Sequence, residues 1–361
     1  MAEQSKNNNN TEQAPTANYS ISTGFVSLLD RLNVSLAITS YQSGRLYLLG
    51  RNPKGGLMVN EQYFQKAMGL NYDGKTLFMA TLANIYRMEN ILRADQVMNE
   101  QFSDCFVPRT AYFTGALDAH DVGVTADGEI RFVNTRYNCI ATTSHIHSFK
   151  PVWKPEFVSA IVSEDRCHLN GLAMQDGQVR YVTAVSKSDT IDGWRDRRAD
   201  GGIIIDVKNN EIICEGLSMP HSPRMYQGKL WVLNSGTGEL GWVDLSKKNK
   251  KKRFTPCCFC PGFVRGLAFN DKYAFVGLSK PRYERFEGLA LDQKLKDADS
   301  DPWCGVQVID LNTGTCVEWF RIDGKIGELY DVEILPETVC PCSYGFLTND
   351  VLGIITIEEG K

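Results

Sequence analysis

The stretch DAHDVGVTADGEIRFVNTRYN (residues 118–138) consists of two short apolar runs on either side of an Ala-Asp-Gly turn. Apolar runs joined by such a turn are typical of a β-hairpin. The polar residues stand at the outer ends, because Asp118, His120 and Asp121 enter the first run and Asn134 ends the second. A hairpin brings its two outer ends together, so we expect these polar side chains to lie at one edge of a sheet.

The same pattern of short strand, tight turn and aromatic-rich strand recurs along the chain. The copies are MGLNYDGKTLFMAT, HDVGVTADGEIRFVNT, NGLAMQDGQVRYVTA, SPRMYQGKLWVLNS, RGLAFNDKYAFVGLS and YDVEILPETVCPCSYGFLTN, with equivalent points at Gly69, Asp121, Gly171, Pro223, Gly266 and Asp331. Further hairpins follow several copies, so each repeat has room for a four-stranded sheet. A closed ring of such sheets is a β-propeller, which protects the strand edges. The sequence therefore predicts an all-β, single-propeller domain over residues 21–361.

The number of blades depends on residues 35–64. This segment aligns with the second to fourth strands of a repeat but lacks a clear first strand. It either adds a seventh blade or completes the last copy, and we favour seven blades with six as the alternative. In both cases we expect the two ends of the chain to pair and close the ring, with LGIITIEE (352–359) as the third strand of the last copy.

The N-terminal region has a different composition. Residues 1–20 are rich in Asn, Gln and Thr and are predicted to be a disordered tail. FVSLLDRL (25–32) has apolar residues at helical spacing and predicts a short helix. The chain shows no signal-peptide pattern and no membrane-length apolar run, which predicts a cytoplasmic protein. A net charge of −4 gives no general attraction to nucleic acid or membrane, so neither is an expected partner, and the oligomeric state is left open.

In a propeller blade the first strand lines the central channel and the second returns beside it. The start of the first strand and the end of the second therefore lie at the same mouth of the channel. The polar residues expected to ring this mouth are His120, Asp121, Asn134, His168, Asn170, His221, Arg224, Asn234, Arg265, Tyr330 and Asp331.

Three of the five histidines, namely His120, His168 and His221, occupy near-equivalent positions in successive copies. Neutral imidazoles converging from rigid elements commonly bind a transition metal and leave positions for water or substrate. We therefore predict a divalent metal ion of unknown identity at these three residues. The alternative is that they are satisfied polar side chains filling a narrow channel.

Arg224 and Arg265 are expected at the same mouth in adjacent copies. Guanidinium groups bind carboxylates in a bidentate manner, which predicts a small anionic substrate. The alternative is internal pairing with Asp121 or Asp331.

Two long insertions, 186–202 and 279–303, follow second strands and should emerge at this mouth as binding loops. The alternative is that they are plain surface excursions. They contribute Trp194 and Arg282 as candidate substrate-binding residues. Asn134, Asn170 and Asn234 are further candidates at the strand ends.

Three resemblances bear on function. LNGLAMQDGQVRYVT resembles the asparagine-glycine strand pair of the gluconolactonase and senescence-marker propellers, which implies that Asn170 helps to hold a metal; the acidic ligand of the following repeat is replaced here by His221-Ser222-Pro223. A histidine-ringed mouth with arginines is similar to the propeller lyases that use a divalent metal to acidify a carbon beside a carboxylate. Across nearly its whole length the chain resembles an uncharacterised bacterial family of propeller-like proteins, through SLAITSYQSGRLYLLG, MGLNYDGKTLFMAT, ALDAHDV, LNGLAM, MPHSPR and VRGLAF.

These observations lead to two hypotheses. The first is a metal-assisted enzyme, a lyase or isomerase rather than a hydrolase, that acts on a small carboxylate-bearing substrate, with Asp121, Tyr330 or Asp331 moving the proton. The second is a non-catalytic scaffold that binds a peptide or protein at the same mouth. An enzyme should have a narrow polar funnel, whereas a scaffold should have an exposed apolar mouth.

Overall fold

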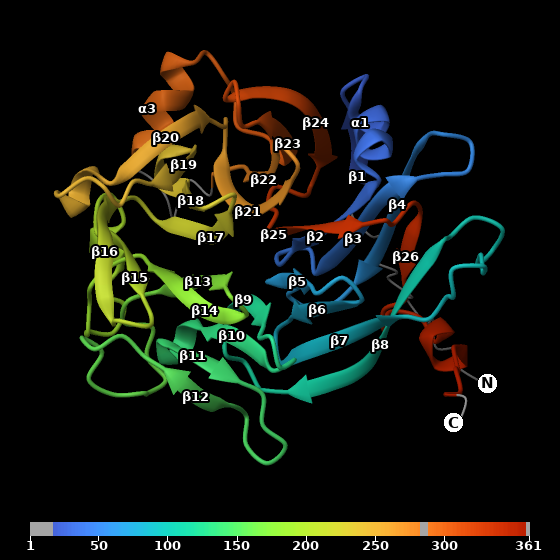
Figure 1. Cartoon of the computed structure of the whole chain (residues 1–361), viewed down its shortest axis with the longest axis horizontal. Helices are drawn as coiled ribbons and strands as arrows, with labels where there is room; N and C mark the ends of the chain where they lie inside the picture. Colours follow the sequence, from blue (N-terminus) through green and yellow to red (C-terminus); the bar gives the residue numbers. More distant parts are fainter. Residues whose placement is uncertain (1–16, 282–287, 359–361) are drawn as a thin grey trace, which may run out of the picture.

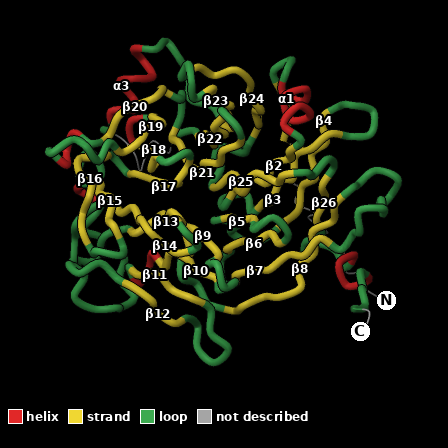
Figure 2. Tube along the Cα trace, viewed as in Figure 1, coloured by secondary structure: helices red, strands yellow, loops and turns green. Residues whose placement is uncertain are grey.

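The computed structural model describes residues 17–281 and 288–358, whose strands form six sheets around a common centre (Figure 1). Strands dominate the trace, and the short helices lie toward the periphery (Figure 2). The predicted all-β propeller is confirmed. Of the two blade counts considered, the six-bladed alternative is the one observed, so the preference for seven blades was wrong.

The blades follow the chain, each from its innermost to its outermost strand. Blade 1 contains β25 (Asp331–Pro336), β2 (Val34–Ser40), β3 (Arg45–Arg51) and β4 (Leu57–Tyr63). Blade 2 contains β5 (Leu70–Tyr72), β6 (Thr76–Ala80), β7 (Asn84–Asn90) and β8 (Asp104–Phe113), with β26 (Pro341–Ser343) outside β8. Blade 3 contains β9 (Ala119–Val124), β10 (Ile130–Asn134), β11 (Cys139–Thr142) and β12 (Lys150–Trp153).

The second half of the ring repeats this order. Blade 4 contains β13 (Leu169–Gln175), β14 (Gln178–Ala184), β15 (Gly202–Asp206) and β16 (Glu211–Leu217). Blade 5 contains β17 (Pro220–Tyr226), β18 (Lys229–Asn234), β19 (Glu239–Val243) and β20 (Phe254–Phe259). Blade 6 contains β21 (Phe263–Asn270), β22 (Tyr273–Ser279), β23 (Cys304–Asp310) and β24 (Thr315–Gly324), with β1 (Ala17–Ile21) outside β24.

Blade 1 is built from both ends of the chain. Strand β25 pairs with β2 in an antiparallel register that runs from Val34 opposite Pro336 to Thr39 opposite Asp331. The segment 35–64 lacks a first strand because β25 supplies it, which is why this segment does not form a seventh blade. The expected closure by the two ends is confirmed, but the third strand predicted over LGIITIEE is wrong. The chain instead forms β26, which pairs in parallel with β8, and then the short 3-10 helix η5 (Asp350–Gly353).

The N-terminal elements lie on the outer edge of the ring. Strand β1 pairs with β24, so residues 17–20 of the predicted tail are strand residues, and residues 1–16 lie outside the described part of the chain. The predicted helix is confirmed as α1 (Phe25–Leu32), which buries Phe25, Leu28 and Leu29. No helix in the described ranges has both the length and the apolar character needed to cross a membrane.

Neighbouring blades are joined by a repeated hydroxyl contact, which we call the hydroxyl latch. In each case a Ser or Thr at or just after the end of a second strand donates to a backbone carbonyl in or just before the next blade's first strand. The four donor–acceptor pairs are Thr39 to Met68 at 2.6 Å, Thr135 to Leu169 at 2.6 Å, Ser235 to Val264 at 2.6 Å and Ser279 to Leu329 at 3.0 Å. The latches hold the ends of the inner strands in place, and the polar residues at these strand ends are held in place with them.

Candidate functional site

A cavity of about 240 Å³, here called the mouth pocket, opens where the first strands begin. Its wall is formed by Tyr41, Lys66, Met68, Asp118, His120, Asp165, His168, Trp194, Arg195, Arg198, Met219 and Arg265. The pocket therefore gathers the start of several blades, as the repeat pattern predicts. Its wall is rich in charged and imidazole side chains.

Two of the predicted histidines have the same surroundings in blades 3 and 5. Nδ1 of His120 lies 2.8 Å from the carbonyl of Asp118 and 2.8 Å from Oγ1 of Thr135, while Nδ1 of His221 lies 2.8 Å from the carbonyl of Met219 and 3.0 Å from Oγ of Ser235. Both hydroxyls are latch donors, so their protons point at the next blade. Nδ1 must then carry the imidazole proton, which leaves Nε2 unprotonated.

Burial keeps both of these imidazoles neutral. It lowers the pKa of His120 to about 3, with a further contribution from nearby His168. Burial also holds the pKa of His221 well below its ordinary value, assisted by the positive charge of Arg265. Nε2 of His221 is buried and has no hydrogen-bond partner in the structure.

His168 is held differently from the other two. Its Nδ1 lies 2.6 Å from Oδ2 of Asp165, and Oδ1 of the same carboxylate accepts the backbone N–H of His168 at 3.0 Å. The ring stacks on Trp194 with centroids 4.1 Å apart and meets His120 edge-on at 5.0 Å. The imidazole therefore has a fixed orientation and a carboxylate partner.

The strand registers explain why His168 differs. Ala119, Leu169 and Pro220 each pair with the last residue of their blade's second strand, so His120, Asn170 and His221 are equivalent. His168 stands two residues earlier, in the left-handed backbone position that Asp118 and Met219 occupy in their blades, with φ of 52° for His168 and Asp118 and 48° for Met219. The sequence analysis treated His168 as equivalent to His120 and His221, but His168 stands two residues before the equivalent position.

The three histidines do not fit a metal site. Within residues 17–281 and 288–358, no group of three or more His, Cys, Asp or Glu side chains is arranged to hold a metal ion. His120 and His168 lie together, but the third imidazole does not complete a set of ligands with them. The predicted three-histidine metal site is therefore not found in these ranges, because His221 does not join the pair formed by His120 and His168.

Arg265 lies in the mouth pocket, as predicted, and is 7% exposed. Its guanidinium carbon lies 4.9 Å from the ring centroid of Phe263 and 5.4 Å from that of Tyr330. The nearest carboxylate is that of Glu328, at 3.7 Å from Nη1, which is beyond hydrogen-bonding distance. Nε of Arg265 is buried without a hydrogen-bond partner.

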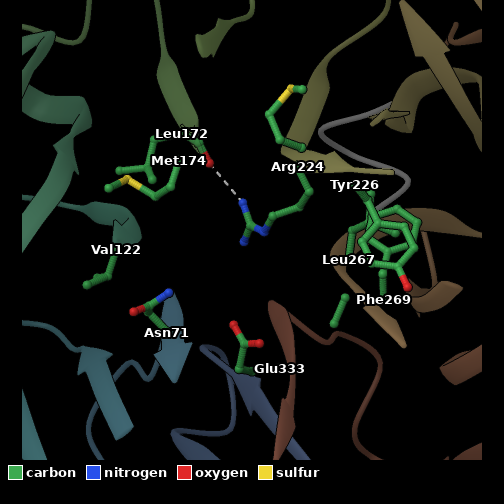
Figure 3. Close-up of a pocket in the computed structure, with 11 residues that line it drawn as sticks. Asn71, Val122, Leu172, Met174, Arg224, Tyr226, Leu267, Phe269 and Glu333 are labelled. Atoms are coloured by element: carbon green, nitrogen blue, oxygen red, sulfur yellow. Dashed lines mark hydrogen bonds between the residues drawn. The ribbon is translucent and has the colours of Figure 1, made fainter. Parts of the chain in front are cut away.

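Arg224 does not share this mouth. It lines a second cavity, also of about 240 Å³, beside Asn71 and Glu333 (Figure 3). Its Nη1 lies 2.8 Å from Oδ2 of Asp121, and its Nη2 lies 3.2 Å from Oδ1 of Asp121 and 3.6 Å from Oδ1 of Asp331. A register shift in β17 between His221 and Arg224 carries the guanidinium further along the channel. The alternative of internal pairing is therefore the one observed for Arg224.

Of the three predicted proton carriers, Asp121 and Asp331 belong to this internal cluster. Both are 3% exposed, and each accepts a backbone N–H from a neighbouring blade, from Leu172 at 3.0 Å and from Leu70 at 2.8 Å. Burial raises the pKa of Asp331 to about 7 and that of nearby Glu333 to about 8, although Arg224 opposes both shifts.

Tyr330 stays close to the mouth pocket. Its ring lies 5.6 Å from that of His120 and 5.5 Å from that of Tyr41. Burial holds the pKa of its hydroxyl well above the ordinary value, so the group is a neutral donor. Its oxygen is buried without a hydrogen-bond partner.

The three predicted asparagines have structural contacts and are not among the residues that line the mouth pocket. Asn134 accepts the backbone N–H of Tyr137, Asn170 accepts the hydroxyl of Thr183, and Asn234 accepts the backbone N–H of Ser218. Trp194 does line the pocket. Arg282 lies outside the described residues.

The two insertions meet at the mouth. The first contains the 3-10 helix η2 (Arg195–Arg197) and the second contains α3 (Ala290–Asp297). Apolar side chains of both insertions pack with those of the neighbouring blades in one buried cluster that consists of Val185, Trp194, Met219, Phe263, Leu289, Leu291 and Leu295. Trp194, which stacks on His168, and Phe263, whose ring contacts Arg265, are therefore packed against side chains of the insertions.

Two charged residues of the pocket wall were not predicted, namely Lys66 and Asp165. Asp118 was expected at this edge from its place at the strand entry, and Arg195 and Arg198 belong to the first predicted insertion. Asp118 forms an ion pair with Lys66. Burial opposes ionisation of Asp118, but the ammonium group of Lys66 outweighs it and lowers the pKa of this carboxyl. The position of Asp165 three residues before His168 was a usable signal, because a short turn there brings carboxylate and imidazole together.

The geometry defines a six-bladed propeller with a charged mouth pocket that is lined in part by the first insertion. The chain belongs to the family described as a domain of unknown function (DUF4915), whose model matches residues 23–343. No curated protein matches the sequence.

Among solved structures, a nidogen/laminin complex contains a chain with 12% identity that covers 84% of this chain and 99% of its own length, with a TM-score of 0.53. This likeness concerns the fold. A gluconolactonase from Xanthomonas campestris has 12% identity, with 82% and 87% coverage and a TM-score of 0.45. A virginiamycin B lyase from Staphylococcus aureus has 10% identity, with 85% and 99% coverage and a TM-score of 0.40.

Proposed function

We propose that the mouth pocket is the active site of an enzyme that binds a small carboxylate-bearing substrate and moves a proton by acid–base chemistry. One observation carries this proposal: a carboxylate-oriented imidazole, His168, lines the same cavity as Arg265, whose guanidinium has no hydrogen-bonded carboxylate. The first group supplies a base and the second supplies an anion-binding site.

His168 has the features of a general base. Asp165 accepts from Nδ1, so Nε2 carries the lone pair that takes a proton. A carboxylate in this position also stabilises the imidazolium that forms after proton transfer. The stack on Trp194 keeps the ring plane in place while the charge changes. Tyr330, a neutral buried hydroxyl beside His120, is a candidate acid for the opposite side of the substrate.

Arg265 is suited to hold a substrate carboxylate. The rings of Phe263 and Tyr330 shield it from water, and a charge-assisted hydrogen bond is stronger in such surroundings than in solvent. Glu328 keeps the guanidinium in position without a close bidentate contact. A ligand carboxylate therefore has donors to bind without first breaking a short ion pair.

The composition of the pocket wall favours lyase or isomerase chemistry over hydrolysis. None of the wall residues in the described ranges is Ser, Thr or Cys, the usual nucleophiles of covalent hydrolysis. A base next to a bound carboxylate instead suits abstraction of a proton from the adjacent carbon. No metal is assigned to this step, because the histidines lack the required donor arrangement.

The scaffold alternative has less support. A protein-binding mouth should expose apolar side chains, whereas this wall is mainly charged and polar. Exposed large apolar residues occur at several places on the described chain, and one group lies near its C-terminal end, at Phe346, Leu347, Leu352, Ile355 and Ile357.

The test is hydrogen–deuterium exchange at the carbon beside the carboxylate. A panel of small 2-hydroxy acids, which carry a hydrogen on that carbon, is incubated with the protein in D₂O and followed by proton NMR. We expect exchange for at least one acid, slowed about 10²- to 10⁴-fold by Asp165→Asn with binding retained. Arg265→Ala should weaken binding of the same acid. Absence of exchange across the panel, or equal rates in Asp165→Asn and His168→Ala and the unchanged protein, would refute the proposal.

A further inference from the structure

The cavity that holds Arg224, here called the second cavity, lies in the central channel and is separate from the mouth pocket. It has a volume of about 240 Å³, and none of its wall residues lines the mouth pocket. The innermost strand of every blade contributes to its wall, with Asn71 from β5, Val122 from β9, Met174 from β13, Tyr226 from β17, Phe269 from β21 and Glu333 from β25. The whole ring therefore shapes this cavity.

The wall of the second cavity combines a large apolar surface with few polar groups. Among the described residues that line it, three contribute a charged or amide side chain, namely Asn71, Arg224 and Glu333. Figure 3 shows these three side chains directed from different strands toward the same open space. The hydroxyl of Tyr226 is already used, because it donates to the carbonyl of Asp271 at 2.6 Å.

Arg224 has its partners within the protein. Its Nη1 donates to Oδ2 of Asp121 at 2.8 Å and to the carbonyl of Leu172 at 3.0 Å, and its Nη2 lies between Asp121 and Asp331. Two carboxylates thus balance the charge of this guanidinium. An anionic ligand would have to compete with both of them, so Arg224 does not make the cavity an anion site.

Glu333 and Asn71 have unused hydrogen-bonding capacity. Oε1 of Glu333 accepts the backbone N–H of Ile334 at 3.1 Å. Within residues 17–281 and 288–358, its Oε2 has no hydrogen-bond partner, no Lys or Arg forms an ion pair with it, and the side-chain amide of Asn71 makes no hydrogen bond. A carboxyl and an amide therefore face the cavity without a partner.

The charges around Glu333 favour a positive ligand. The titratable groups that face it are Arg224 from β17, Asp331 from its own strand and Asp121 from β9, so three carboxyls surround one guanidinium. Burial raises the pKa of Glu333 to about 8, Arg224 opposes this shift, and Asp331 and Asp121 add to it. At neutral pH the empty cavity therefore keeps a proton on Glu333, in the place where a cation is missing.

We propose that the second cavity binds a small organic cation, a primary ammonium group on an apolar body, through the carboxylate of Glu333 and the amide oxygen of Asn71. The apolar body would contact Met174 and Phe269, since thioether and aromatic groups pack well against alkyl and aryl carbons. A metal ion is a poorer fit, because no three His, Cys, Asp or Glu side chains of the described chain are arranged to hold one. This site is independent of the function proposed for the mouth pocket.

The proposal is tested by calorimetric titration with three probes of similar size. Benzylamine is the cation, benzyl alcohol is the neutral analogue and benzoate is the anion. We expect benzylamine to bind one site per chain, about tenfold or more tightly than either of the others, a difference of ~1.4 kcal/mol. Titrations in buffers of different protonation enthalpy should show release of roughly one proton per benzylamine at pH 7, because the ligand replaces the proton on Glu333.

The dependence on pH gives a second measurement. Benzylamine stays protonated between pH 6 and pH 8, whereas Glu333 gains its charge in this range. The affinity should therefore rise by about tenfold or more from pH 6 to pH 8. In Glu333→Gln most of this rise and most of the proton release should be lost, and the affinities of the two proteins should converge at pH 6.

The variants separate the site from general effects. Glu333→Gln should leave binding of benzyl alcohol unchanged, which shows that the cavity is intact. Asn71→Ala should weaken benzylamine without removing the proton release. Glu156→Gln, a change of an exposed carboxylate outside the cavity, is the matched control and should bind benzylamine as wild type does.

Four outcomes would overturn the proposal. The first is a lack of saturable benzylamine binding at millimolar concentration. The second is tighter binding of benzoate or benzyl alcohol than of benzylamine. The third is an equal effect of Glu333→Gln and Glu156→Gln, which would place the amine elsewhere on the surface. The fourth is benzylamine binding with neither proton release nor a rise of affinity with pH.

Discussion

Nδ1 of His168 lies 2.6 Å from Oδ2 of Asp165, whereas the Nδ1 atoms of His120 and His221 face backbone carbonyls and hydroxyls. A backbone carbonyl that accepts from Nδ1 fixes the tautomer of a buried imidazole, whereas a carboxylate also stabilises the charged form of the ring. The three histidines of the channel therefore have different chemical roles. The carboxylate beside His168 is the partner that the proposed general base requires, while burial keeps His120 and His221 neutral.

The first prediction concerns the imidazole tautomers. Long-range nitrogen–proton NMR should show protonated Nδ1 and unprotonated Nε2 for His168 in the neutral protein. In Asp165→Asn the side-chain amide can donate to Nδ1, so the proton should move to Nε2, as in other carboxylate-to-amide changes beside a catalytic histidine. The tautomers of His120 and His221 should not change. A His168 spectrum that is the same in both proteins would contradict this assignment.

The second prediction concerns the internal ion pair. Arg224→Leu leaves Asp121 and Asp331 buried without their cation, so the free energy of unfolding in urea should fall by about 3–5 kcal/mol. Arg321→Ala is the control, because the side chains of Arg321 and Asp323 are 43% and 41% exposed, and it should cost less than about 1 kcal/mol. Equal losses in the two variants would show that the buried cluster is not a major source of stability.

The third prediction concerns the pH dependence of stability. Burial raises the pKa of Glu333 to about 8, above the value of about 4.3 expected in the unfolded chain. The folded protein then binds more protons than the unfolded protein between these values, so stability is highest below this range and decreases as the pH rises toward 8. Glu333→Gln should reduce this slope, by at most about 1.4 kcal/mol per pH unit, and should stabilise the protein at pH 9 relative to wild type.

The measurement is urea unfolding at pH 5, 7 and 9 for wild type and Glu333→Gln. Glu156→Gln changes an exposed carboxylate and should keep the wild-type slope. Asp331, with a pKa of about 7, contributes in the same direction, so some slope should remain in Glu333→Gln. The prediction is contradicted if Glu333→Gln has the same dependence of stability on pH as wild type.

The fourth prediction concerns metal content. Protein purified without a tag or added metal should contain far less than one transition-metal ion per chain by elemental analysis, because the donors are not arranged to hold one. Single His120→Ala, His168→Ala and His221→Ala variants should have the same content as wild type. Stoichiometric metal that is lost in all three variants would restore the three-histidine site.

The repeated hairpins allowed the first strands to be located from the sequence with good accuracy. Pro223 and Asp331, two of the predicted strand starts, lie within or at the start of β17 and β25. The pocket was harder to predict, because shifts of one or two residues decide which way a side chain points. The register shift in β17 places Arg224 away from the mouth. His168 stands two residues before the position that is equivalent to His120, and there its ring contacts the carboxylate of Asp165.

The blade count could not be decided from local patterns, since the answer depends on which distant strand joins residues 34–40. Pairing energy between two strands is not visible in the sequence of either one. The same holds for Lys66 and Asp118, which form an ion pair although they belong to different repeats.

The joining of β25 to β2 also constrains when this protein can fold. The backbone N–H of Asp331 donates to Oγ1 of Thr39 across 292 residues of sequence, so blade 1 has no inner strand until nearly all of the chain has been synthesised. Contacts between such distant residues carry a large loop-closure entropy and form late. The nascent chain must therefore leave the ribosome with an open ring whose β2 edge is unpaired. The strand β26, which follows β25 in the chain, then pairs with β8, so the C-terminal segment holds blade 2 as well as blade 1.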